Sequence, residues 1–302
     1  PDPTATTAAA ARIPCKMQYK HAFHAGNFAD VHKHIALLQL VHALQKKAKG
    51  FLFLDTHAGA GLYDLGGADA RHSGESQAGI ATVQQSAAGS TSLHPAIADY
   101  LARIERFRAG GSRHSYPGSP LLAASLLRAV DLCVAVESQA QVSRALQRAF
   151  DQHAALLTST PRVENGDGYA AVKRLLPPAL RRGLVLIDPP YEAADEDKHI
   201  AAALAAGLLR FEGGVFAVWY PIKRQHDADL FTSRLVRGLT RPALTLELCV
   251  NPADHAAGLN GSGMLVVNPP WQFDVDAQEW QRQLLQLLGG SGGATVRWLI
   301  HE

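Results

Sequence analysis

Several features are scarce in this chain of 302 residues, and each scarcity argues against a class of protein. Its three cysteines, Cys15, Cys133 and Cys249, are odd in number and far apart, which fits neither a disulfide framework nor the usual cysteine spacing of a zinc site. No apolar run approaches the ~20 residues of a membrane span. The formal net charge is only +2, which permits a nucleic-acid partner without requiring one. We therefore expect a cytoplasmic globular protein without membrane association.

The chain also has no internal repeat and no low-complexity linker that would divide it into several domains. Its first sixteen residues are mostly Ala, Thr and Pro and show no hydrophobic periodicity, so residues 1–16 are predicted to be a flexible extension. Met17 is a plausible native start. Residues 17–302 are then predicted to form one domain.

Short apolar runs recur along this domain, with helical patterns between most of them. The runs cover residues 51–55, 132–137, 184–187, 214–221, 243–250, 263–267 and 295–299, with a further strand edge beginning at Arg162. Such alternation predicts an α/β fold with helices packed on a central, mostly parallel sheet of about seven strands.

Residues 62–114 interrupt this alternation after the first strand. They are rich in Gly, Ser, Ala and Arg and contain helical patterns near 77–85 and 97–107, so we predict a small helical insertion there. The run Arg103-Ile104-Glu105-Arg106-Phe107-Arg108 places cations beside an aromatic ring, which suits RNA backbone and base contacts. A solvated helix face is an equally good interpretation.

Acids and glycines follow four of the predicted strands. Residues 55–61, Asp-Thr-His-Ala-Gly-Ala-Gly, include Gly59 and let the backbone approach a ligand closely, although a tight turn alone would explain them. They lack the full dinucleotide fingerprint. Glu137 ends the next strand, where an acid typically binds a ribose hydroxyl pair. Asp167, between two glycines, can accept a hydrogen bond from a cofactor adenine or simply form a turn.

The fourth of these strands ends in Asp188-Pro189-Pro190-Tyr191. Proline cannot continue a ladder, so the acid and the ring are held on a stiff turn at the carboxyl end of a buried strand. This tetrapeptide is the signature of methyltransferases that modify an exocyclic amino group. The Asp188 carboxylate and the Pro189 carbonyl would accept the two amino hydrogens, and Tyr191 would stack on the base.

A second sequence of the same kind, Asn268-Pro269-Pro270-Trp271, also follows an apolar strand. The order of the strands favours Asp188 as the catalytic residue, because the glycine turn, Glu137, Asp167 and Asp188 end successive strands. Asn268 comes later and is expected to lie in an antiparallel hairpin near the sheet edge.

The amino-terminal part of the domain is rich in histidine. A Gly-Asn turn leads into a predicted helix over residues 29–46, and four histidines, at positions 21, 24, 32 and 34, lie in or near it. His32 and His34 are two residues apart, on different helix faces, and no cysteine is near, so we disfavour a metal site. Packing, cofactor contact and RNA contact remain open. Farther on, Ser119 is predicted to cap a helix that extends through Arg128, with Pro120 at its first position.

Taken together, six segments resemble the ribosomal large-subunit RNA methyltransferase J family, which makes N6-methyladenine at adenine 2030 of 23S rRNA. The most specific are Phe23-His24-Ala25-Gly26-Asn27 and Tyr116-Pro117-Gly118-Ser119-Pro120. The six segments cover residues 19–34, 54–61, 116–120, 183–192, 218–221 and 261–271.

The resemblance implies a Rossmann-like methyltransferase that uses S-adenosylmethionine, releases S-adenosylhomocysteine and needs no metal, because the sulfonium already activates the methyl group. It implies a monomer acting on 23S rRNA, with Asp188 as the proton acceptor and Tyr19, Lys20 and His21 contacting the RNA. The pocket for the cofactor and the target adenine would be lined by Lys33, His34, His57, Gly59, Ser119, Glu137, Asp167, Gly168 and Asp188.

Two other functions stay open. The Asp188 turn by itself also suits a DNA adenine-N6 methyltransferase. A non-catalytic RNA-binding protein is the third possibility, although the intact set of Glu137, Asp167 and Asp188 argues against a decayed site.

Overall fold

The structure is a computed structural model that describes residues 23–252 and 258–301. Residues 1–16, Met17 and the predicted RNA-contacting residues Tyr19, Lys20 and His21 lie outside the described residues. None of the described helices is long and apolar enough to cross a membrane.

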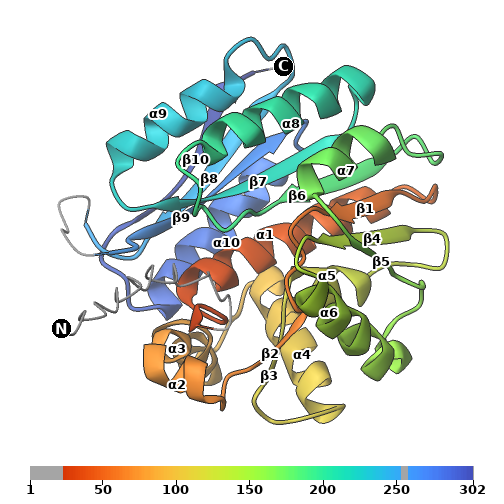
Figure 1. Ribbon diagram of the computed structural model, residues 1–302. Helices are drawn as coiled ribbons and strands as arrows, with labels where there is room; N and C mark the ends of the chain where they lie inside the picture. The colour runs from red at the N-terminus through yellow and green to blue at the C-terminus, as the bar shows by residue number, and fades with distance from the viewer. Residues whose placement is uncertain (1–22, 253–257, 302) are drawn as a thin grey trace, which may run out of the picture.

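The apolar runs form one eight-stranded sheet in the order β10-β8-β9-β7-β6-β1-β4-β5 (Figure 1). Its strands are β1 (Leu52–Asp55), β4 (Leu132–Glu137), β5 (Arg162–Asn165), β6 (Gly183–Ile187), β7 (Val215–Ile222), β8 (Ala243–Cys249), β9 (Gly261–Val267) and β10 (Gly293–Ile300). β7, β6, β1, β4 and β5 are parallel neighbours, whereas β9 runs antiparallel to both β7 and β8, and β10 antiparallel to β8. The predicted mostly parallel sheet is confirmed.

Helices cover both faces of the sheet (Figure 1). One face packs against α7 (Gly168–Leu175), α8 (Glu196–Arg210) and α9 (Gln225–Val236). The other packs against α1 (Phe28–Gln45), α5 (Ser119–Ala124), α6 (Ala140–Gln152) and α10 (Phe273–Leu287). Strands in the middle of such a sheet lose water from both faces, which explains why all five residues of β6 are apolar or glycine and all are buried.

Residues 62–114 lie between β1 and α5 and contain several helices. They fold into β2 (Leu62–Asp64), α2 (Ala68–Ser73), a π-helical turn (Gln77–Ala81), α3 (Thr82–Ala88) and α4 (Pro95–Ala109). β2 then pairs antiparallel with β3 (Ser115–Pro117), so a short ribbon brings the two ends of the segment together.

The cation-rich run on α4 differs from the surface that we expected for RNA. Phe107 is buried in the core, and Arg103 and Arg108 pair with Asp99 and Glu105 on the same helix. Phe107, Arg103 and Arg108 therefore stabilise α4 and its packing, whereas Arg106 of the same run is exposed.

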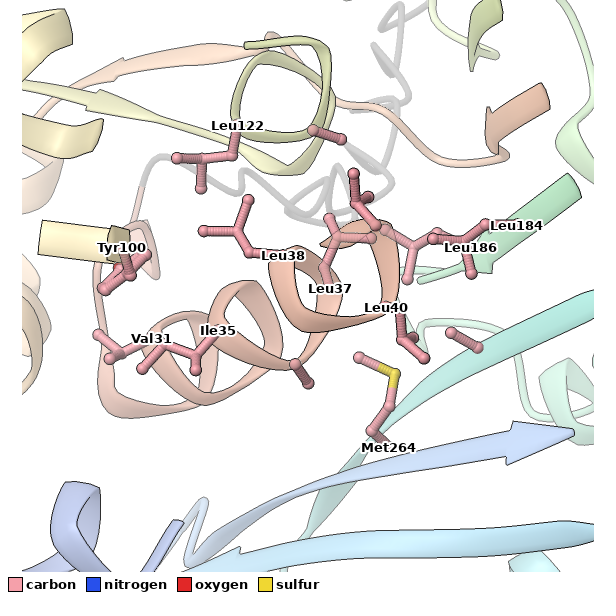
Figure 2. Packing of buried hydrophobic residues seen from close by; sticks show 14 of the residues in the cluster. Val31, Ile35, Leu37, Leu38, Leu40, Tyr100, Leu122, Leu184, Leu186 and Met264 are labelled. Carbon is pink, nitrogen blue, oxygen red and sulfur yellow. The ribbon is translucent and has the colours of Figure 1, made fainter. Parts of the chain in front are cut away.

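Helix α1 is buried along most of its length. Thirteen of its eighteen residues are buried, because α4, α5, α10 and the sheet surround it. Figure 2 shows its leucines among Tyr100 of α4, Leu122 of α5 and Met264 of β9. The polar residues of α1 are consequently enclosed as well, and each needs a partner inside the protein.

Helix α5 also differs from the prediction at both ends. Gly118 occupies the N-cap position, Ser119 is already helical, and the helix ends at Ala124 instead of Arg128. Ser119 does not cap the helix because its hydroxyl points to another partner, Asp55.

Candidate active site

The predicted acids gather at one edge of the sheet because their strands are parallel. Asp55 at the end of β1 pairs in register with Ala135 of β4 and Leu186 of β6. Glu137 and Asp188 each lie two residues farther along, so they follow their strands at the same level. The carboxyl edge of the five parallel strands is therefore where a ligand of this fold binds.

Asp188 has one oxygen held and one open. Its Oδ2 accepts a hydrogen bond from Lys33 Nζ at 2.7 Å, and the side chains of Lys33 and Asp188 are 4% and 12% exposed. Within the described residues, Oδ1 of Asp188 has no hydrogen-bond partner. The turn thus fixes the carboxylate and still offers one acceptor to a ligand.

Lys33 is buried between two carboxylates. Its Nζ donates to Asp30 Oδ1 at 2.7 Å as well as to Asp188, and it lies 5.5 Å from the centre of the Trp219 ring. Burial alone would lower the pKa of Lys33, but the charges of Asp188 and Asp30 outweigh this effect and raise it. Lys33 is therefore an ammonium at any physiological pH.

Tyr191 is held beside Asp188 in a left-handed backbone conformation, with φ of 54°. Its hydroxyl donates to the Trp219 carbonyl, and its ring meets Trp219 and Phe231 edge-on at 5.7 and 6.0 Å. Burial raises the pKa of Tyr191 well above its ordinary value, so the phenol stays neutral. Pro189 is buried beneath this turn.

Asp55 was not among the predicted site residues, yet it lies at the centre of the edge. It is fully buried, its Oδ2 accepts from the Ser119 hydroxyl at 2.7 Å, and its Oδ1 accepts from the His57 amide at 3.2 Å. Burial raises the pKa of Asp55 to about 7, the bond from Ser119 opposes this rise, and the charge of Asp188 adds to it. An acid at the end of a buried strand was the signal available in the sequence.

The glycine turn after β1 is tied to Glu137. The Gly59 amide donates to Glu137 Oε2 at 3.1 Å, and the Gln139 amide donates to Oε1 at 2.8 Å. Gly59 has φ of 62°, which suits glycine, and a Cβ there would lie 2.4 Å from the Tyr63 hydroxyl. This backbone therefore cannot carry a larger residue without moving.

Asp167 and Gly168 join the same edge at the start of α7. Asp167 is exposed and caps the helix, because its Oδ1 accepts from the amides of Tyr169 and Ala170 at 2.8 and 3.3 Å. A Cβ on Gly168 would lie 1.9 Å from the Thr56 carbonyl oxygen, so glycine lets α7 pack directly on the turn after β1. The His57 ring stands edge-on to Tyr169 at 4.8 Å, and burial lowers the pKa of His57.

Two histidines of α1, His34 and His32, are buried in the core. His34 is buried, bonds to the Tyr116 hydroxyl at 3.1 Å and packs against the rings of Tyr100 and Tyr116. His32 bonds to Ser262 at 2.9 Å and Gln281 at 2.8 Å. Across residues 23–252 and 258–301, no group of three or more His, Cys, Asp or Glu side chains is placed to hold a metal ion.

Asn268 lies at the end of the sheet where the parallel strands begin, whereas Asp188 lies at the end where they finish. β9 lies between β7 and β8, inside the sheet, and runs antiparallel to β7, so Asn268 comes beside the start of β7. Its amide donates to the carbonyls of Glu212 and Gly214 at 2.8 and 2.7 Å. The expected antiparallel hairpin is confirmed, because β8 and β9 pair antiparallel, but β9 lies inside the sheet and not at its edge. The Asn268 side chain fixes the turn between α8 and β7.

A cavity of about 360 Å³ lies beyond the end of β7, where β8 ends and β9 and β10 begin. Its lining includes Glu247, Asn251 and Asn260 and none of the predicted site residues. The chemistry of Asp188 is therefore separate from this cavity.

Comparison with known proteins agrees with this architecture. Residues 48–300 match the family model described as "Ribosomal RNA large subunit methyltransferase D, RlmJ". The chain is 37% identical to Ribosomal RNA large subunit methyltransferase J of Escherichia coli (strain K12) and 38% identical to the protein of that name from Haemophilus influenzae, over 95% of this chain and 100% of each relative.

A solved structure agrees as well. The crystal structure of protein LPL1258 from Legionella pneumophila is 29% identical, covers 92% of this chain and 99% of its own, and superposes with a TM-score of 0.80. Because the family model covers most of the chain and the relatives match over their full length, the chain belongs to the RlmJ family of ribosomal RNA large-subunit methyltransferases.

Proposed function

We propose that this protein transfers a methyl group from S-adenosylmethionine to the exocyclic N6 of an adenine in 23S rRNA, the position numbered 2030. It would act as a monomer in the cytoplasm. The observation that carries this proposal is the Asp188 carboxylate at the carboxyl end of the parallel strands, whose Oδ2 is held by Lys33 while Oδ1 has no hydrogen-bond partner among the described residues. The membership in the RlmJ family supports the RNA as substrate.

The charges at this edge suit a cationic cosubstrate. Asp30 and Asp188 share the buried ammonium of Lys33, and Glu137 is the last residue of its strand at the same end of the sheet, so the carboxylates at this end outnumber that ammonium and favour a ligand with positive charge. When bound, S-adenosylmethionine supplies a methyl group activated by its sulfonium, and the C–S electron pair stays with sulfur in the product S-adenosylhomocysteine. The residues that would hold it are Lys33, His34, His57, Gly59, Ser119, Glu137, Asp167 and Gly168.

Asp188 and Pro189 would make the adenine amino group nucleophilic. The lone pair of that nitrogen is delocalised into the ring, and hydrogen bonds from its two N–H groups to Asp188 Oδ1 and the Pro189 carbonyl would localise it. As the N–C bond forms, one of these protons passes to Asp188. Because Tyr191 is fixed at its hydroxyl, its ring would give the base a rigid surface to stack on.

The target base must leave its stack to reach this turn. Tyr19, Lys20 and His21 precede α1, whose first turns carry Asp30 and Lys33. We propose that these three residues contact the RNA that flanks the flipped adenine.

The test compares Asp188→Asn with Asn268→Ala in a strain that lacks the gene, with N6-methyladenine in 23S rRNA mapped by mass spectrometry. We expect Asp188→Asn to lower methyl transfer by about 10²- to 10⁴-fold, the usual contribution of a positioned general base. Asn268→Ala should leave turnover unchanged at a temperature where the protein is folded. Equal losses in both variants would refute the assignment of Asp188.

Two assays with purified protein distinguish the proposed function from the two alternatives. Faster methylation of duplex DNA than of protein-free 23S rRNA would favour a DNA methyltransferase. Calorimetry that detects no binding of S-adenosylmethionine would favour a non-catalytic RNA-binding protein.

A further inference from the structure

The Lys33 ammonium is shared between Asp30 and Asp188. The two carboxylates receive hydrogen bonds of equal length, 2.7 Å, from the same ammonium. Asp30 and Lys33 are both 4% exposed, and they lie three residues apart on α1, which places them on one helix face. Two carboxylates and one ammonium leave this buried group with a net charge of −1.

The Asp30 carboxylate is itself fixed by the turn that starts α1. Its Oδ2 accepts from the Gly26 amide at 3.0 Å, and its own amide donates to Asn27 Oδ1 at 2.9 Å. The Asn27 amide group in turn donates to Glu75 Oε2 at 2.9 Å, on the segment between α2 and the π-helical turn. Asp30 is therefore preorganised before any ligand binds.

A pair consisting of Lys33 and Asp188 alone would be neutral. It would present little negative potential to an amino group that becomes positive as it is methylated, and the ammonium would compete for the same carboxylate. A second carboxylate bonded to the same ammonium removes both difficulties. Lys33 can then orient Asp188 while Asp30 compensates the positive charge of Lys33.

We propose that Asp30 is a positioning residue for methyl transfer, which acts through Lys33 to leave Asp188 oriented and negatively charged toward the reacting amino group. This inference rests on the function proposed above for Asp188. It assigns to the first turn of α1 a part in the reaction that does not require contact with the substrate.

The test is a double-mutant cycle of Asp30→Asn and Lys33→Met, with kcat and the KM for RNA measured for all four proteins. Asparagine keeps the shape and the acceptor for Gly26. We expect Asp30→Asn to lower kcat about 10- to 30-fold and to change the KM for RNA less than twofold. In the Lys33→Met background the same substitution should lower kcat less than twofold, because Asp30 then has no ammonium to act through.

Asp131→Asn is the matched control, since Asp131 is also a buried acid paired with a cation, Arg128, near the start of β4. It should leave kcat unchanged. An equal factor for Asp30→Asn in both backgrounds, or a wild-type kcat for Asp30→Asn, would overturn the role of Asp30.

The double variant keeps the test valid where Asp30→Asn alone does not fold, because it buries no uncompensated ammonium. A kcat tenfold below that of Lys33→Met would then overturn the inference, and one within twofold would support it. Failure of the wild-type protein to methylate 23S rRNA would instead overturn the proposed function, which distinguishes the two.

Discussion

Replacing Asp55 with asparagine should stabilise the protein, and more so at higher pH. Burial raises the pKa of Asp55 to about 7 from an ordinary value of 3.8, despite the bond from Ser119. In the unfolded chain Asp55 loses its proton near pH 3.8, whereas in the folded protein it keeps the proton until about pH 7. The unfolded state therefore binds fewer protons across this window, and this group makes the folded state less stable as pH rises.

The size of the effect follows from the two pKa values. Each tenfold change in a protonation equilibrium corresponds to about 1.4 kcal/mol, so Asp55 costs about 4 kcal/mol above pH 7 and about 2 kcal/mol at pH 5. Asparagine has the same shape and no proton to lose. Asp55→Asn should thus raise the free energy of unfolding by about 2–3 kcal/mol more at pH 8 than at pH 5.

The measurement is urea unfolding of wild type and variant at both pH values and one ionic strength. Comparison with wild type is needed because burial lowers the pKa of His32 to about 4, and this group makes the protein less stable as pH falls from 6.5. That effect is common to both proteins and cancels. A stability difference that is the same at pH 5 and pH 8, or larger at pH 5, would refute the reasoning.

Two further pairs of substitutions test the packing around the site and in the core. Gly168→Ala places a methyl group 1.9 Å from the Thr56 carbonyl oxygen. It should lower the free energy of unfolding in urea by about 3 kcal/mol and weaken S-adenosylmethionine binding in calorimetry. Gly166→Ala meets nothing within 4 Å and should change both quantities little. Leu38→Ala in the buried α1 should lower the free energy of unfolding by about 3–4 kcal/mol, whereas Leu209→Ala, at a side chain 89% exposed, should lower it by less than about 0.5 kcal/mol. Similar losses of stability for the two members of either pair would contradict the packing described above.

The strands of the sheet were predictable because central parallel strands are buried on both faces and read as continuous apolar runs. Helices α2, α7 and α9 were not predicted. Helix α7 is short and begins at Gly168, after an acid between glycines, which by itself indicates a turn. Helix α9 buries only Ala228, Thr232 and Leu235 along its length, so its apolar pattern is weak.

The acids of the site were predictable from their places after strands, but their partners were not. Lys33 and Asp188 are 155 residues apart in sequence, and no local pattern connects them. Only Asp30 and Lys33, with helical spacing, could have been paired in advance. Asn268 shows that a local sequence can also mislead. Its sequence resembles that around Asp188, and only the antiparallel direction of β9 places it at the other end of the strands.

The inserted segment leaves the site intact because its ends meet. The β2–β3 ribbon brings Gly61 and Gly118 together, and the Gly118 amide donates to the Gly61 carbonyl at 2.7 Å. Helix α5 can therefore start beside the turn after β1, as a helix that followed β1 directly would, and Ser119 reaches Asp55 from its first turn. The segment from 62 to 114 thus supports α1 through Glu75, and it leaves the contact between Ser119 and Asp55 in place.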